Sequence, residues 1–193
     1  MSSTRMLRFL IAAGLALAGA GAAATYGAAR EGVPARATVQ VDGDGQFVAN
    51  RFVRETFHFV HADVTIRSGG RLTFEDGAKL SLSDPHTLTI VNRSDLPRTV
   101  GELDVCIGDV PGTPCVLGAA NLPSASHPTG VRFVDVGKPG LDERGDSIGL
   151  PPAATPNGIP HGRVTVTVTA KPGATLYFFC AVHPWMRGVI HVK

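Results

Sequence analysis

Residues 178–188 read Phe-Phe-Cys-Ala-Val-His-Pro-Trp-Met-Arg-Gly. Before them, residues 175–180 have the apolar composition of a buried strand, and residues 188–192 form another short apolar run after them. A cysteine, a histidine and a methionine follow one another at intervals of three residues between the two runs. A tight loop between two strands therefore presents three metal-binding side chains, Cys180, His183 and Met186.

The chemistry of these three side chains points to copper. An ion that cycles between Cu(I) and Cu(II) favours a soft thiolate, imidazole nitrogens and a weak axial thioether. Pro184 would stiffen the loop and remove one backbone donor. Taken singly, a cysteine or a methionine is more often an apolar core residue. Together, in this order and between strands, they predict a site for one copper ion.

This segment resembles the corresponding loop of the cupredoxins, the blue-copper family that includes plastocyanin, azurin and amicyanin. The short Cys-x2-His-Pro-x-Met-x-Gly form is most similar to amicyanin. The resemblance is looser over residues 56–91 and does not extend to residues 92–160. It implies a Greek-key β-sandwich with copper at one end.

The resemblance also implies a histidine ligand at the start of an inner strand further upstream. His86, which precedes the strand-like run of residues 87–91, matches that position. A competing frame, Asn-x-x-Asp-x-x-His read from Asn92, would place the ligand at Arg98, whose guanidinium stays protonated and cannot bind a metal. We therefore expect His86, Cys180 and His183 in a trigonal plane, with Met186 as a long axial ligand.

Short alternating apolar segments are spread over the chain and predict an all-β sandwich within residues 51–193. The clearest is residues 163–169, in which valines alternate with threonines. Ten of the 14 prolines lie in residues 92–160, so this segment is expected to be a long, loop-rich insertion. Residues 30–50 show no period and are expected to be a flexible lead-in. No amphipathic helix is expected outside the N-terminus.

The N-terminus has the composition of an export signal. Arg5 and Arg8 precede an uncharged stretch, and residues 1–29 are expected to be a signal peptide or, alternatively, an N-terminal membrane anchor. The expected location is extracytoplasmic: periplasmic, secreted or tethered to the outer face of the cell membrane. Without residues 1–29 the chain has 16 basic and 16 acidic side chains, which argues against a nucleic-acid partner.

The chain has three cysteines, and an odd number in an exported protein leaves one thiol unpaired. Cys106 and Cys115 lie close together in a turn-rich stretch. A disulfide between them is expected in an oxidising compartment, and a second metal site is the alternative. Cys180 is then the free thiol.

These features predict an exported type 1 copper protein that carries single electrons. Its redox partner proteins are expected to bind through a weak, transient interface near His183 and Trp185. Trp185 could equally pack against residues 92–160. An extracytoplasmic copper-binding or delivery protein without a carrier role is the alternative function. An enzyme is not expected, because four protein ligands leave no open coordination position.

Overall fold

The computed structural model describes residues 32–77, 85–107, 113, 115, 133–150 and 162–193. The expected signal or anchor, residues 1–29, lies outside them, as does much of residues 92–160. All the elements below belong to one compact unit, Gly32–Lys193. None of the described helices is long and apolar enough to span a membrane.

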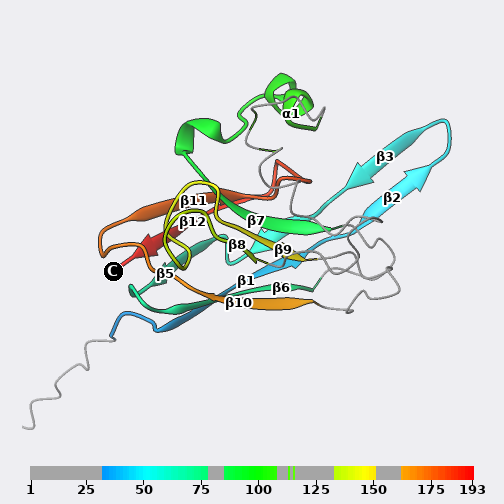
Figure 1. The fold of residues 1–193 in the computed structure, drawn as a ribbon. Coiled ribbons are helices and arrows are strands. Elements are labelled where there is room, and N and C mark those ends of the chain that lie inside the picture. Colours follow the sequence, from blue (N-terminus) through cyan, green and yellow to red (C-terminus); the bar gives the residue numbers. More distant parts are fainter. Residues whose placement is uncertain (1–31, 78–84, 108–112, 114, 116–132, 151–161) are drawn as a thin grey trace, which may run out of the picture. The chain divides into compact units, whose positions relative to one another are not determined.

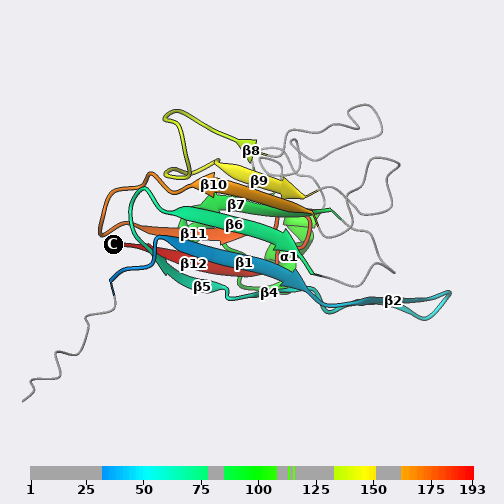
Figure 2. The ribbon, with the colours of Figure 1, turned by 90° about the horizontal axis from the view of Figure 1, so that it is seen from below.

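Two sheets face each other and form the β-sandwich expected from the sequence (Figures 1 and 2). The first sheet has the order β10 (Arg163–Thr167), β6 (Arg71–Asp76), β1 (Arg36–Asp42) and β4 (His58–Val60). The second has the order β5 (Asp63–Ile66), β12 (Arg187–Val192), β11 (Thr175–Phe179), β7 (His86–Val91), β9 (Ser147–Leu150) and β8 (Phe133–Val134). The pairs β1–β6 and β5–β12 are parallel, and the other pairs are antiparallel.

Alternation along the strands builds the core between the sheets. In β6, Leu72 and Phe74 are fully buried while their neighbours are less buried or exposed. All six residues of β7 are buried. One face of β7 points into the core, and the other is covered in part by a second apolar cluster that includes Val91 and Phe179. The central strands of the second sheet are therefore shielded from water on both faces.

The interpretation of residues 30–50 as a flexible lead-in is wrong for β1. This strand lies between β6 and β4, and Val39 and Val41 are fully buried in the core. Its register with β6 pairs Arg36 with Arg71. The partner strand is thus distant in sequence. Ala37, Val39 and Val41 do alternate with polar residues, but the charged and turn-forming residues on either side obscure this short pattern.

Residues 92–160 are not wholly an insertion. They contain a 3-10 turn, η1 (Arg93–Asp95), the helix α1 (Val100–Ile107), β8 and β9. Strand β9 pairs with β7, and its Ile148 and Leu150 are core residues. Asp146, just before β9, is fully buried and accepts backbone N–H groups from residues 136, 142 and 143. Four residues are too few to show a period, so the sequence hid this strand.

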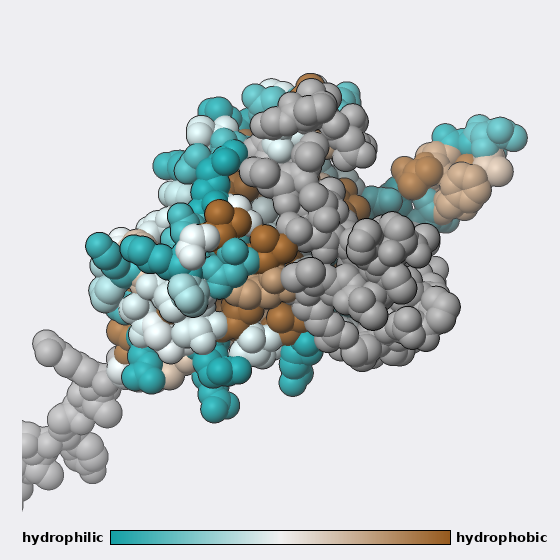
Figure 3. All heavy atoms as spheres, viewed as in Figure 1, coloured by the Kyte–Doolittle hydropathy of each residue, from teal (hydrophilic) through white to brown (hydrophobic). Residues whose placement is uncertain are grey.

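A hairpin of β2 (Gly45–Val48) and β3 (Phe52–Glu55) forms a separate two-stranded sheet that extends beyond the sandwich (Figures 1 and 2). Asn50 in its turn has a φ of 60°, a left-handed value that asparagine tolerates well. Phe47 and Val53 face each other across the hairpin and are 72% and 66% exposed. Figure 3 shows this apolar surface on the projecting arm.

The position of β1 can be tested with a buried charge. Val41→Asp would place a carboxylate without a partner in the core and should lower the free energy of unfolding by about 3 kcal/mol or more. Urea unfolding followed by circular dichroism measures the change. Val33→Asp is the control, because Val33 is 43% exposed. Equal stability of the two variants would contradict the placement of β1.

Candidate metal centre

The structure brings together three of the four ligands expected from the sequence. His86 begins β7, Cys180 directly follows β11, and His183 lies on the loop before β12. One ligand atom from each lies within 4.8 Å of the others, and the three residues are 1%, 0% and 3% exposed. Metal bonds of about 2.0–2.3 Å place the donors of one trigonal ion about 3.5 Å apart, so binding a metal would bring the most distant pair closer by at most about 1.3 Å.

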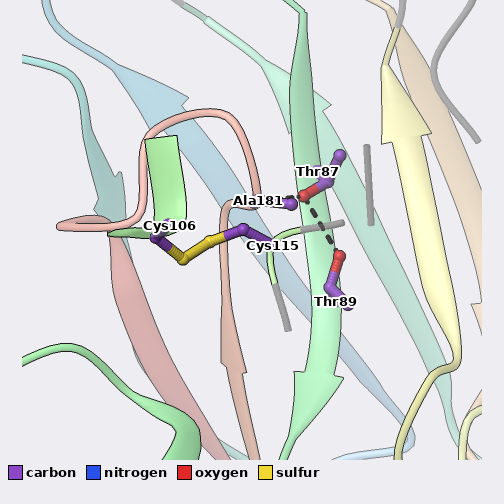
Figure 4. The surroundings of a disulfide bond; sticks show 5 residues. All are labelled: Thr87, Thr89, Cys106, Cys115 and Ala181. Atoms are coloured by element: carbon purple, nitrogen blue, oxygen red, sulfur yellow. Dashed lines mark hydrogen bonds between the residues drawn. A yellow bond between two sulfur atoms is a disulfide. The ribbon is translucent and has the colours of Figure 1, made fainter. Parts of the chain in front are cut away.

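Thr87 joins the two halves of this site. Its backbone N–H donates to Cys180 Sγ at 3.3 Å, and its Oγ1 accepts the N–H of Ala181 at 2.7 Å. The Thr89 hydroxyl donates to Thr87 Oγ1 in turn (Figure 4). Sequence reasoning missed Thr87, because its position next to His86 was the only available signal.

Backbone hydrogen bonds shape the loop that carries the other donors. The N–H of Cys180 donates to the carbonyl of Met186 at 2.9 Å, and the N–H of Met186 donates to the carbonyl of His183 at 2.8 Å. Met186 is 2% exposed and belongs to the core cluster. The loop thus holds all three residues of the sequence motif. Coordination by the Met186 thioether stays a prediction.

The burial of the donors controls their protonation. Desolvation, with a smaller contribution from the nearby charge of His183, lowers the pKa of His86 to about 3. Neither ring nitrogen of His86 has a hydrogen-bond partner among the described residues. Burial also raises the pKa of the Cys180 thiol. A neutral imidazole with orphaned nitrogens beside a buried sulfur fits a bound metal cation, which would satisfy both groups.

Two aromatic side chains and a carboxylate lie next to the histidines of the site. The Phe57 ring lies 5.0 Å from the rings of both His86 and His183. Trp185 packs edge-on against His183 at 5.2 Å, and its Nε1–H donates to the carbonyl of Phe57 at 3.1 Å. Glu55 Oε2 lies 3.8 Å from His183 Nε2. Sequence reasoning missed Phe57 and Glu55, because both lie far upstream of the loop.

The expected disulfide is confirmed. Cys106 and Cys115 are bonded, with their Cα atoms 5.3 Å apart, and Cys180 is the free, buried cysteine. The disulfide belongs to one apolar cluster with Phe179 and Ala181, the chain neighbours of Cys180. Figure 4 shows the disulfide together with Ala181. The disulfide therefore covers the side of the sheet behind the metal-binding loop.

Trp185 packs beside residues 92–160, as one of its two interpretations expects, and its role in docking a redox partner stays a prediction. Trp185 is 37% exposed, and it lines a pocket together with residues 97–100, 103 and 187. It thus borders residues 92–160 while keeping an accessible edge. Arg98 lines this surface pocket and is not in the His-Cys-His group.

The fold is similar to those of solved copper proteins. A purple cupredoxin from Nitrosopumilus maritimus is 12% identical, with a TM-score of 0.40 over 81% of this chain and 99% of that one. Auracyanin A, a blue copper protein from Chloroflexus aurantiacus, is 18% identical, with a TM-score of 0.38 over 82% of this chain and 99% of that one. A copper nitrite reductase from Nitrosomonas europaea is 14% identical, with a TM-score of 0.34 over 82% of this chain and 41% of that one. No family model and no curated protein matches.

The buried neutral imidazole of His86 predicts a pH dependence in the metal-free protein. The unfolded chain takes up a proton near pH 6.5, whereas folded His86 resists protonation down to about pH 3. The free energy of unfolding should therefore fall as the pH drops from 6.5 towards 3, by several kcal/mol and at most about 5. Urea titrations at successive pH values measure it. His86→Leu should flatten the curve, whereas the exposed His58→Gln should not. If the free energy of unfolding of His86→Leu still fell with pH as steeply as in the unaltered protein, His86 would not be the group responsible.

Proposed function

We propose that this protein is an exported type 1 (blue) copper protein that carries single electrons between redox partners. The observation that carries the proposal is the buried group of His86, Cys180 and His183 at one end of the β-sandwich. A thiolate with two imidazoles is the donor set of trigonal blue-copper sites. The Cys106–Cys115 disulfide supports an oxidising, extracytoplasmic location.

The protein's own groups prepare the site for electron transfer. Copper, when bound, would supply the one-electron change between Cu(II) and Cu(I). The Thr87 N–H stabilises negative charge on Cys180 Sγ, and burial keeps His86 unprotonated and able to bind. The donors are held by paired strands and a hydrogen-bonded loop, so they would move little between oxidation states.

Met186 is proposed as the fourth, axial ligand, because it lies buried on the same loop as Cys180 and His183. A thioether is a soft donor that suits Cu(I), and a long axial bond tunes the reduction potential. The four donors then leave no open position for a substrate, which favours a carrier over an enzyme. The burial of the three other donors also disfavours a copper-delivery role, since an acceptor would have to reach them.

Redox partners are proposed to dock weakly and transiently at the end of the sandwich that holds His183 and Trp185. Trp185 touches the His183 ring and is partly exposed, so it offers a short path from the site to the surface. The β2–β3 hairpin starts beside this surface through Glu55 and carries exposed apolar side chains. No membrane contact is proposed unless the N-terminal segment is retained as an anchor.

The absorption spectrum of the copper-loaded protein tests the proposed site. An intense thiolate-to-copper band near about 600 nm is expected, with the narrow hyperfine splitting of a blue site in the EPR spectrum. Cys180→Ser should abolish the band while the circular dichroism of the fold is retained. His86→Ala should weaken or shift it, and the exposed His58→Ala should leave it unchanged. A colourless Cu(II) protein would refute the carrier function.

Electron self-exchange between two copies of the protein tests the docking surface without a known partner. Trp185→Glu would place like charges on both partners, and the exchange rate should fall about tenfold at low salt and recover in part at high salt. NMR line broadening in mixtures of the Cu(I) and Cu(II) forms measures the rate. Thr73→Glu, on the first sheet, is the control. An equal loss in both variants would place the exchange surface elsewhere.

A further inference from the structure

Glu55, the last residue of β3, lies beside the outer nitrogen of His183. The Glu55 Oε2 to His183 Nε2 distance is 3.8 Å, and the two side chains are 29% and 4% exposed. This distance is longer than a direct hydrogen bond but close enough for a strong electrostatic interaction. The surrounding rings of Phe57 and Trp185 displace water from the histidine and reduce screening.

The geometry distinguishes the two nitrogens of His183. Nδ1 lies 3.7 Å from Cys180 Sγ and therefore faces the metal position. Nε2 points the other way, towards the carboxylate. In a neutral imidazole one nitrogen carries the proton and the other keeps its lone pair. A carboxylate at Nε2 favours the tautomer with the proton there, which leaves the Nδ1 lone pair free for the metal.

The base of the hairpin fixes Glu55 in this place. Thr56 donates its N–H to the carbonyl of Asp44 at 2.8 Å and its hydroxyl to the same carbonyl at 2.9 Å. Asp44 returns its own N–H to Thr56 Oγ1 at 2.9 Å. Strand pairing adds Gly45 opposite Glu55. The hydrogen bonds between Asp44 and Thr56 thus hold the Glu55 carboxylate in place. This segment lies outside the Cys180–Met186 motif.

We propose that Glu55 is a positioning residue that acts through His183. It holds Nδ1 free for the metal, and its negative charge favours the oxidised ion, which carries one more positive charge than the reduced ion. The inference rests on the proposed copper function, and it adds Glu55 to the residues that influence the reduction potential of the site. The β2–β3 hairpin thus supplies, through Glu55 at its base, a carboxylate that influences the balance between the two oxidation states.

The redox test replaces the carboxylate with an amide of the same shape. In Glu55→Gln, equilibration with a mediator of known potential should shift the Cu(I)/Cu(II) ratio about three- to tenfold towards Cu(I), while the blue band persists. Glu55→Asp keeps the negative charge, so its Cu(I)/Cu(II) ratio should return most of the way to that of the unaltered protein. Glu75→Gln is the control, because it removes the same charge from a side chain paired with Arg163.

A second readout needs no redox activity. In the zinc-loaded, nitrogen-15-labelled protein, the His183 Nε2–H should give a proton signal in slow exchange with water, and Glu55→Gln should broaden or remove it. A blue protein in which Glu55→Gln changes neither the ratio nor this signal would overturn the role of Glu55 alone. If the unaltered protein lacks the blue band, the carrier function fails, and the redox part of this inference fails with it.

Discussion

The site depends on the contact between the start of β7 and the end of β11. Thr87 binds Cys180 Sγ with its backbone N–H and Ala181 with its hydroxyl, across 93 and 94 residues of sequence. These bonds place the thiol beside His86, whose ring nitrogens have no hydrogen-bond partner among the described residues. Separating the strands would leave buried polar groups unpaired, which costs about 1–3 kcal/mol for each group. The same contact therefore holds the second sheet together and aligns the metal donors.

Apolar groups on two sides of this contact keep water away from it. On one side the Cys106–Cys115 disulfide packs with Phe179 and Ala181. On the other, Phe57 touches both histidine rings. These covers come from separate parts of the chain, and their shared effect is a low-polarity site. Such an environment explains why the pKa of His86 is lowered and the pKa of the Cys180 thiol is raised. A bound cation would reverse the penalty on the thiolate, so metal binding and site formation are coupled.

Sequence reasoning succeeded where the signal was local. The Cys180-to-Met186 motif lies within one loop, and the disulfide closes over nine residues. It failed where a strand is short or its partner is distant. Strand β1 was interpreted as part of a lead-in because charged and turn-forming residues flank its short alternating run. Strand β9 has four residues, too few to show alternation. Asp146 lies in a stretch without strand-like alternation, yet it is buried and its carboxylate accepts the backbone N–H of Asp142 before β9.

The sequence by itself indicated Cys180, His183 and Met186 as candidate metal donors, because softness and spacing of side chains are properties of the residues and of one tight loop. It also indicated a β-sandwich, because alternation is visible in several segments, most clearly in residues 163–169. Only the tertiary structure decided what surrounds the donors: the Thr87 contact, the Phe57 wall and the Glu55 carboxylate beside His183. These neighbours come from strands and turns distant in sequence. Their approach is fixed by sheet register and packing, which no local pattern of residues encodes.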